Sequence, residues 1–394
     1  MHRMFSGPDD PAETTTEIAN ANFTAWTRLH NRARVAAHTL PLTSSSTMFD
    51  VTIETPSGQM TFSYVISTPT KTVVERIPTA ERSLPTVVFL HPVYIGKLIW
   101  HRQFASRQLR RFNLVALDLR GHGRTVGAAG AGYGREVAAT DVGMFMEALE
   151  IPRYHIFGMS MGGCIGIQTA ISFPDAVQSV FVVSSLSLTE PPDVADGRRE
   201  MITYLMQISE EIEAGAMLDT SPDSPSAARV ALMGAMQLSA NGEPSPFITA
   251  AAIATLAETR TSWKERMKYV EITTVDFFVK RSPFTIEALK KIKCPVQLVH
   301  CSADIAYSLE STEQVAGLMR EAGVEVDVQQ VSGAPHFGAA THPNQINTLF
   351  HRFILSRCTA DGAPPPIPQK VESPFASTLS GFESDDDSDR EYFV

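Results

Sequence analysis

Ser160 stands in the run Gly158-Met159-Ser160-Met161-Gly162-Gly163, directly after the apolar segment 154–157. A serine between glycines at a strand-to-helix junction is typical of a nucleophile elbow, a sharp turn that exposes a reactive hydroxyl. The glycines allow close backbone packing where a Cβ would clash. The helix that follows would point unpaired N–H groups at an oxyanion formed beside the serine. This pattern predicts that Ser160 is a catalytic nucleophile.

A serine hydroxyl is a weak nucleophile that needs a general base, and the base needs a group that orients it. Asp304 follows the apolar segment 295–301, and His336 follows the segment 324–331. Both residues therefore come just after predicted strands, as Ser160 does. The chain order of serine, aspartate and histidine also fits such a site. We predict that Ser160, Asp304 and His336 form a catalytic triad.

Apolar segments alternate with helical ones through the middle of the chain. Further strands are expected at 86–91, 113–118 and 180–183, with helices over 136–150 and 162–173. Strands that are apolar throughout and alternate with helices indicate a parallel sheet covered on both faces. In such sheets ligands bind at the carboxyl ends of the strands. The predicted fold class is therefore α/β.

Over roughly residues 48–356 the chain resembles the α/β-hydrolase superfamily. The motifs that carry the resemblance are His91-Pro92-Val93-Tyr94, Asp118-Leu119-Arg120-Gly121-His122-Gly123, the Ser160 elbow, Asp304, and the stretch from His336 through Pro343 to Phe353. The resemblance implies a doubly wound, mostly parallel, eight-stranded sheet with an inserted helical cap. It also implies Ser160 as nucleophile, His336 as general base and then acid, and Asp304 as the residue that orients His336.

The loop after the first predicted core strand departs from the family pattern. Relatives often have His-Gly where this chain has His91-Pro92, and proline has no N–H to donate. The family pattern then implies that the N–H groups of Val93 and Met161 form the oxyanion hole.

The segment between the strands at 180–183 and 295–301 is much longer than one crossover helix requires, and long insertions of this kind tend to be lids. Helical patterns are expected at 198–213, 227–238, 248–259 and 262–278. We expect a helical cap that covers a cleft for a small to medium hydrophobic substrate. The residues expected to line this cleft are Tyr94, Trp100, Met159 and Phe337.

The 394 residues carry a net charge of −10, most of it in polar terminal segments. The body is close to neutral, which argues against a nucleic-acid partner. The expected organisation is a disordered N-terminal segment (1–20), the first part of the core (21–188), the cap (189–286), the second part of the core (287–358) and a disordered acidic tail (359–394).

No segment approaches the roughly 20 apolar residues of a membrane span, and the acidic N-terminal stretch is unlike a signal peptide. We therefore expect a cytoplasmic protein without a membrane span. Metal-ligand spacing is absent from the sequence, and we expect neither a metal nor a cofactor. The oligomeric state stays open.

The favoured function is hydrolysis of an ester, thioester or lactone through an acyl-enzyme on Ser160. The sequence leaves open an acyltransferase or a carbon–carbon bond hydrolase that uses the same triad. A third class is a non-catalytic ligand-binding or signalling protein built on a hydrolase scaffold. The filled triad positions favour an enzyme.

Overall fold

We describe a computed structural model of the protein over residues 48–215, 226–243, 245–259, 263–358 and 363–380. The expected N-terminal segment 1–20 lies outside the described residues, as do 21–47 and 381–394. Eight strands form one sheet in the order β1-β2-β4-β3-β5-β6-β7-β8. They are β1 (Phe49–Thr55), β2 (Gly58–Ser67), β3 (Thr86–Leu90), β4 (Asn113–Leu117), β5 (Tyr154–Met159), β6 (Val177–Val183), β7 (Val296–Cys301) and β8 (Val326–Val331).

The sheet is antiparallel at one edge and parallel through the rest. The amphipathic β1 pairs antiparallel with β2, which in turn pairs antiparallel with β4. The pairs from β4 through β3, β5, β6 and β7 to β8 are parallel. The central strands β3, β4 and β5 are buried along their whole length, as a parallel sheet covered on both faces requires. The predicted eight-stranded, mostly parallel sheet is confirmed.

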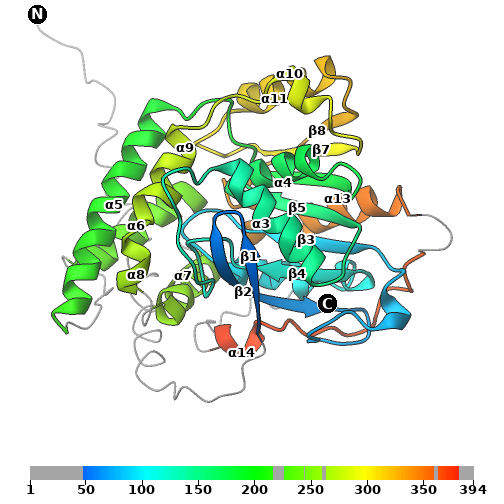
Figure 1. Ribbon diagram of the computed structural model, residues 1–394, viewed down its shortest axis with the longest axis horizontal. Helices are drawn as coiled ribbons and strands as arrows, with labels where there is room; N and C mark the ends of the chain where they lie inside the picture. Colours follow the sequence, from blue (N-terminus) through cyan, green and yellow to red (C-terminus); the bar gives the residue numbers. More distant parts are fainter. Residues whose placement is uncertain (1–47, 216–225, 244, 260–262, 359–362, 381–394) are drawn as a thin grey trace, which may run out of the picture.

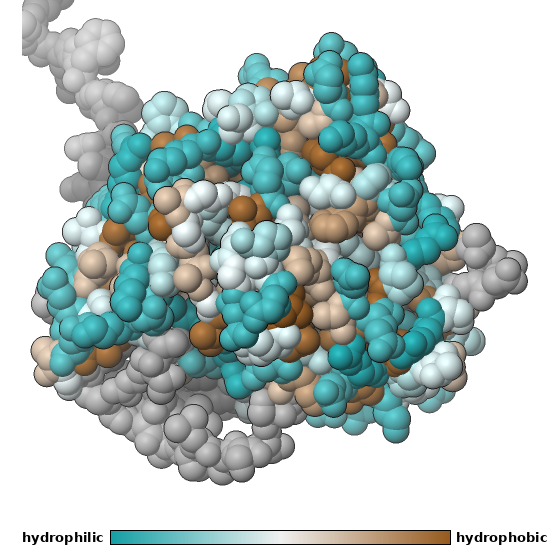
Figure 2. Space-filling view, viewed as in Figure 1, coloured by the Kyte–Doolittle hydropathy of each residue, from teal (hydrophilic) through white to brown (hydrophobic). Residues whose placement is uncertain are grey.

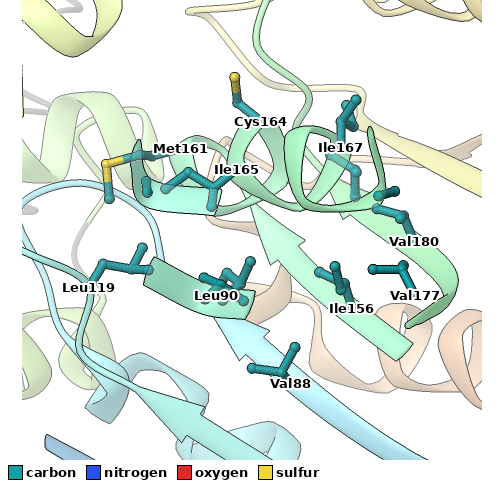
Figure 3. Packing of buried hydrophobic residues seen from close by; sticks show 14 of the residues in the cluster. Val88, Leu90, Leu119, Ile156, Met161, Cys164, Ile165, Ile167, Val177 and Val180 are labelled. Atoms are coloured by element: carbon teal, nitrogen blue, oxygen red, sulfur yellow. The ribbon is translucent and has the colours of Figure 1, made fainter. Parts of the chain in front are cut away.

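Alternate side chains of each strand pack on opposite faces of the sheet. On one face, Val88, Leu90 and Ile156 pack with helices α3 (Arg135–Ala148), α4 (Met161–Ser172) and α11 (Leu309–Glu321). Figure 3 shows α4 lying across β3 and β5, with Ile165 directed at the strands. This packing fixes the position of the helix that follows Ser160.

The other face of the sheet packs against α2 (His101–Phe104), α13 (Pro343–Leu355) and the turn at Lys97–Trp100. Its centre is aromatic: the ring centroids of Phe89 and Phe157 lie 5.2 Å apart, and that of Phe350 lies 4.8 Å from Phe157. Two short helices complete the core segments, α10 (Ile286–Leu289) and α12 (Gly338–Thr341). The sheet is thus a rigid platform between two buried layers.

The insertion between β6 and β7 is helical, and we call its described residues the cap segment. Figure 1 shows its helices gathered beside one end of the sheet. They are α5 (Pro192–Glu213), α6 (Ala227–Ala240), α7 (Pro246–Thr259), α8 (Trp263–Met267) and α9 (Phe277–Val279). The single helix expected over 262–278 is wrong, because α8 ends at Met267 and residues 272–276 form a wider π turn. The hydroxyls of Thr273 and Thr274 bond back to the carbonyls of Tyr269 and Val270, which favours departure from a regular helix.

The chain after α13 also differs from the prediction of a disordered tail over 359–394. Residues 363–380 are ordered and end in helix α14 (Ala376–Leu379). Phe375 and Leu379 are fully buried, and the Phe375 ring lies 5.2 Å from that of Phe104. Arg107 donates to the Pro368 carbonyl at 2.7 Å, and Arg110 donates to that of Glu372 at 2.8 Å. Two buried apolar side chains and these hydrogen bonds outweigh the proline-rich composition.

Hydrophilic residues cover most of the described surface on the face seen in Figure 2, and hydrophobic ones appear in small separate groups. Among the helices in the described ranges, none combines the length and the apolar character that crossing a membrane demands.

Candidate active site

The turn at Ser160 has the strained geometry of an elbow. Ser160 has φ 54° and ψ −117°, a left-handed backbone that is rare for a residue with a Cβ. A Cβ on Gly158 would lie 2.4 Å from the Gly162 carbonyl oxygen, and one on Gly162 would lie 1.9 Å from that of Leu90. Only glycine fits at both positions. The serine is therefore held at the junction of β5 and α4, beside the end of β3.

The structure brings Ser160, His336 and Asp304 into one hydrogen-bonded chain. The distance from His336 Nε2 to Ser160 Oγ is 2.9 Å, and that from His336 Nδ1 to Asp304 Oδ2 is 2.6 Å. His336 comes from the loop after β8, and the hydroxyl of Ser184 donates to its carbonyl at 2.7 Å. The geometry joins three residues that are far apart in the sequence.

Asp304 is held by backbone donors as well as by the imidazole. Its Oδ1 accepts the N–H groups of Ala306 at 2.9 Å and Tyr307 at 3.1 Å. Burial raises the pKa of this carboxyl, but His336 and the two N–H groups outweigh burial and hold the pKa below its usual value. An ionised Asp304 accepts the Nδ1 proton of His336, which leaves Nε2 as the acceptor for the Ser160 hydroxyl.

The two expected oxyanion donors lie where β3 and β5 end. Met161 is the first residue of α4, and the close contact of Gly162 with Leu90 brings that helix end against the loop that carries Val93. Within the described ranges, neither the Val93 N–H nor the Met161 N–H donates to a protein acceptor. The loop is braced by His91, whose Nδ1 lies 2.8 Å from the Pro92 carbonyl and whose Nε2 accepts the Leu119 N–H at 2.9 Å.

A buried ion pair holds the next part of the same loop. The Lys97 ammonium lies 2.5 Å from Asp118 Oδ2, and the two side chains are 0% and 1% exposed. Asp118 also accepts the backbone N–H groups of Lys97 at 2.7 Å and Arg124 at 2.8 Å. Lys97 further donates to the Ser63 hydroxyl. The carboxylate thus ties the loop after β3 to the loop after β4.

The four expected substrate contacts occupy different surroundings. Tyr94 is partly buried and contacts both the main core and the apolar cluster of the cap segment. Phe337 follows the triad histidine, with ring centroids 5.7 Å apart, and Met159 precedes the elbow serine in a fully buried position. Trp100 differs from the prediction: its ring packs in the aromatic core, 5.4 Å from Phe89 and 5.2 Å from Phe157. The apolar turn that contains it covers the sheet.

Sequence reasoning missed Tyr307. Its ring centroid lies 5.3 Å from that of His336, its N–H donates to Asp304, and its hydroxyl lies 2.9 Å from Glu190 Oε1. Because Tyr307 follows Asp304 by three residues, its contacts with Asp304 and His336 could have been suggested from the sequence. The contact with Glu190 could not be foreseen, because 117 residues separate the two.

The triad is enclosed in this conformation. Ser160 is 1% exposed and His336 is 0% exposed. The Phe337 N–H donates to the carbonyl of Ser239 in α6 at 2.9 Å, so the cap segment lies directly beside the triad histidine. Nowhere in the described part of the chain do three or more His, Cys, Asp or Glu side chains gather as a metal site would require.

Comparison with known proteins gives one family model, described as the alpha/beta hydrolase fold, that matches residues 85–215. A relative from Variovorax paradoxus, named as the carbamate hydrolase RutD, is 34% identical over 88 residues, which are 22% of this chain and 33% of that protein. The 3-oxoadipate enol-lactonase 2 of Acinetobacter baylyi is 28% identical over 118 residues, which are 30% of this chain and 43% of that enzyme. The matched segments thus span less than half the length of these relatives.

Solved structures extend the similarity over most of the chain. The enol-lactonase from Burkholderia xenovorans superposes with a TM-score of 0.56 and 17% sequence identity. The superposition covers 77% of this chain and 99% of that one. At this level of identity the likeness concerns the fold.

Proposed function

We propose that this chain, which has the α/β-hydrolase fold, is a serine hydrolase acting on an ester, thioester or lactone. The observation that carries the proposal is the hydrogen-bonded chain from Ser160 through His336 to Asp304, with distances of 2.9 and 2.6 Å. The names of the relatives, a carbamate hydrolase and enol-lactonases, add support for hydrolysis of a carbonyl substrate.

In the proposed reaction, Ser160 Oγ attacks the substrate carbonyl carbon while His336 Nε2 takes the hydroxyl proton. Asp304 stabilises the imidazolium that forms. The tetrahedral intermediate collapses as His336 gives this proton to the leaving oxygen or sulfur, and the acyl group stays on Ser160. Water then attacks the acyl-enzyme with His336 again as base, which releases the acid and restores the serine.

The N–H groups of Val93 and Met161 would stabilise the negative oxygen of both tetrahedral intermediates. The positive end of the α4 dipole favours the same charge. Removal of one such donor typically lowers kcat by a factor of about 10²–10³. The bracing of the loop by His91 and by the Lys97–Asp118 pair supports this role, because an oxyanion hole must be rigid before the reaction begins.

The substrate we propose is small to medium in size and largely hydrophobic. Support comes from the apolar cluster of the cap segment, in which Met201, Ile208 and Trp263 pack with the partly buried Tyr94. Because the triad is enclosed and α6 contacts Phe337, we propose that the substrate enters through displacement of the cap segment. Closure over the acyl-enzyme would then limit which nucleophiles reach it.

A fluorophosphonate probe and a panel of esters, thioesters and lactones test the proposal. We expect labelling of the wild-type protein, loss of labelling in S160A and H336A, and normal labelling in S172A, which alters an exposed serine of α4. Labelling of S160A at the wild-type rate would contradict the assignment of the nucleophile. Absence of labelling in the wild type would favour a ligand-binding protein, and acyl transfer to an added alcohol faster than to water would favour an acyltransferase.

A further inference from the structure

A fully buried ionic cluster joins the two ends of the cap segment to the triad. Arg198 Nε lies 2.6 Å from Glu190 Oε1, and Arg281 lies 3.5 Å from Glu190 Oε2, with all three side chains at most 3% exposed. Tyr307 accepts from Arg198 Nη2 at 3.0 Å and lies against the imidazole of His336. Glu190 lies at the start of the cap segment and Arg281 near its end, so the cluster links the two ends of the cap segment.

The cluster holds more positive than negative charge. Across the described residues, Glu190 is the one carboxylate that forms an ion pair with either Arg198 or Arg281. Two guanidinium groups on almost fully buried side chains therefore share a single carboxylate, and Arg281 also donates to the carbonyl of Ser187. An uncompensated charge in such a place is costly unless a ligand of opposite charge completes it.

Unused hydrogen-bond donors mark where such a ligand would bind. Arg198 uses Nε for Glu190 and Nη2 for Tyr307, and one face of its guanidinium lies 3.5 Å from the Phe278 ring centroid. Its Nη1 is buried and, among the described residues, has no hydrogen-bond partner of good geometry. The hydroxyl of Tyr94 is also buried without a hydrogen bond of good geometry to any described residue, and it lies close enough to the side chains of Arg198 and Thr274 to interact weakly with both.

These donors lie next to the reaction centre. Tyr94 directly follows Val93, the expected oxyanion donor, and Tyr307 contacts both the Arg198 guanidinium and the His336 imidazole. A group bound there would thus be part of a molecule whose carbonyl reaches Ser160. A carboxylate fits best, because its two oxygens can accept from a guanidinium N–H and a phenol at once.

We propose that Arg198 and Tyr94 form a subsite for a carboxylate carried by the substrate, with Arg198 Nη1 and the Tyr94 hydroxyl as donors. The inference rests on the proposed hydrolase function and narrows its substrate class. The substrate would be a half-ester or lactone that presents a carboxylate a short apolar chain away from the reacting carbonyl. The apolar part of the molecule would contact the cap cluster.

Paired substrates test the subsite. 4-Nitrophenyl butyrate is neutral, whereas mono-4-nitrophenyl glutarate carries a carboxylate at the far end of the acyl chain. We expect the wild type to favour the glutarate in kcat/KM, and R198K to lose about tenfold to a hundredfold of this preference, mainly through KM. Y94F should lose less of this preference, because the neutral hydroxyl of Tyr94 makes a weaker hydrogen bond to a carboxylate than a guanidinium does. R199Q, which alters an exposed arginine one residue away, should keep the wild-type preference.

Binding to the S160A protein gives a readout that does not need turnover. Calorimetric titration with glutarate should detect binding that weakens at least tenfold in S160A/R198K and is unchanged in S160A/R199Q. Absence of glutarate binding, or equal loss of both esters in R198K, would overturn the carboxylate subsite while leaving the hydrolase proposal intact. A wild-type protein that binds glutarate but neither labels with the probe nor hydrolyses any ester would instead refute the hydrolase function.

Discussion

Replacing Lys97 with methionine tests how strongly buried charge holds the loop beside the active site. Methionine keeps most of the apolar volume but removes the ammonium that contacts Asp118 and the Ser63 hydroxyl. The Asp118 carboxylate would stay buried, with the backbone N–H groups of residue 97 and Arg124 as its remaining donors. Breaking one side of a buried pair typically costs about 3–5 kcal/mol.

The remaining donors place the expected cost at the lower end of that range. Each hydrogen bond to a charged group contributes about 1.5–3 kcal/mol, and Asp118 keeps two of them. We therefore expect K97M to lower the free energy of unfolding by about 3 kcal/mol, measured by urea denaturation at neutral pH. K97M/D118N removes both charges and should recover about half of this loss. K293M, which breaks an exposed pair with Asp175, should show no measurable change.

The pH dependence of the difference in stability between the wild type and K97M is the most direct test of this reasoning. In the wild type, burial raises the pKa of Asp118 but Lys97 and the donated hydrogen bonds outweigh it, so the pKa is lowered. The resulting stability is present above the carboxyl's unfolded pKa and is lost as the pH falls. In K97M, the Asp118 carboxyl is buried without the ammonium, so its pKa is raised. Protonation of this carboxyl as the pH falls then removes the buried charge and reduces the destabilisation of the variant. The difference between the two proteins should shrink from about pH 7 to about pH 4, and a constant difference would refute the electrostatic reasoning.

Three further substitutions probe the triad, the elbow and the ordered tail. D304N should lower kcat by a factor on the order of 10⁴ by favouring the wrong tautomer of His336, while circular dichroism shows an unchanged fold; a near-normal kcat would exclude Asp304 from the triad. G162A places a Cβ 1.9 Å from the Leu90 carbonyl oxygen, so it should destabilise the protein by about 1–3 kcal/mol and slow probe labelling, and a normal labelling rate would contradict the tight packing. F375A should cost about 3–5 kcal/mol in urea denaturation, and a wild-type midpoint would mean that residues 363–380 are not part of the folded core.

The sequence predicts the central sheet well because its strands are buried on both faces. The segments expected at 86–91 and 113–118 coincide with β3 and β4 to within one residue at each end. The strand expected at 180–183 begins earlier, at Val177. Its first residues were not predicted because polar residues interrupt the apolar pattern there. Ser179 is tolerated in the sheet since its hydroxyl lies 2.8 Å from His155 Nδ1.

Chain order and strand ends were enough to predict that Ser160, Asp304 and His336 would meet, because the carboxyl ends of parallel strands share one edge of a sheet. The buried cluster around Arg198 could not be predicted. Its members come from the two ends of an insertion and from the loop after β7, and no local pattern relates them. Trp100 was assigned by proximity in sequence alone, which cannot distinguish the two faces of a loop.

The ordered part of the tail, residues 363–380, was not predicted because the proline-rich and acidic composition was given more weight than the spacing of the apolar residues. Proline and acidic residues indicate disorder, yet Phe375 and Leu379 are spaced as one face of a helical turn. Such a short apolar pair becomes informative only when a matching surface is known, and here that surface includes Phe104.

Residues 363–380 are translated after every strand of the sheet, yet they cover aromatic surface contributed by α2 early in the chain. During synthesis that surface stays exposed until the segment that covers it has left the ribosome. Protein engineers who shorten the chain at the end of α13 would make this transient exposure permanent. A boundary placed beyond Ser380 keeps the cover in place, and expression trials at the two boundaries should differ in aggregation.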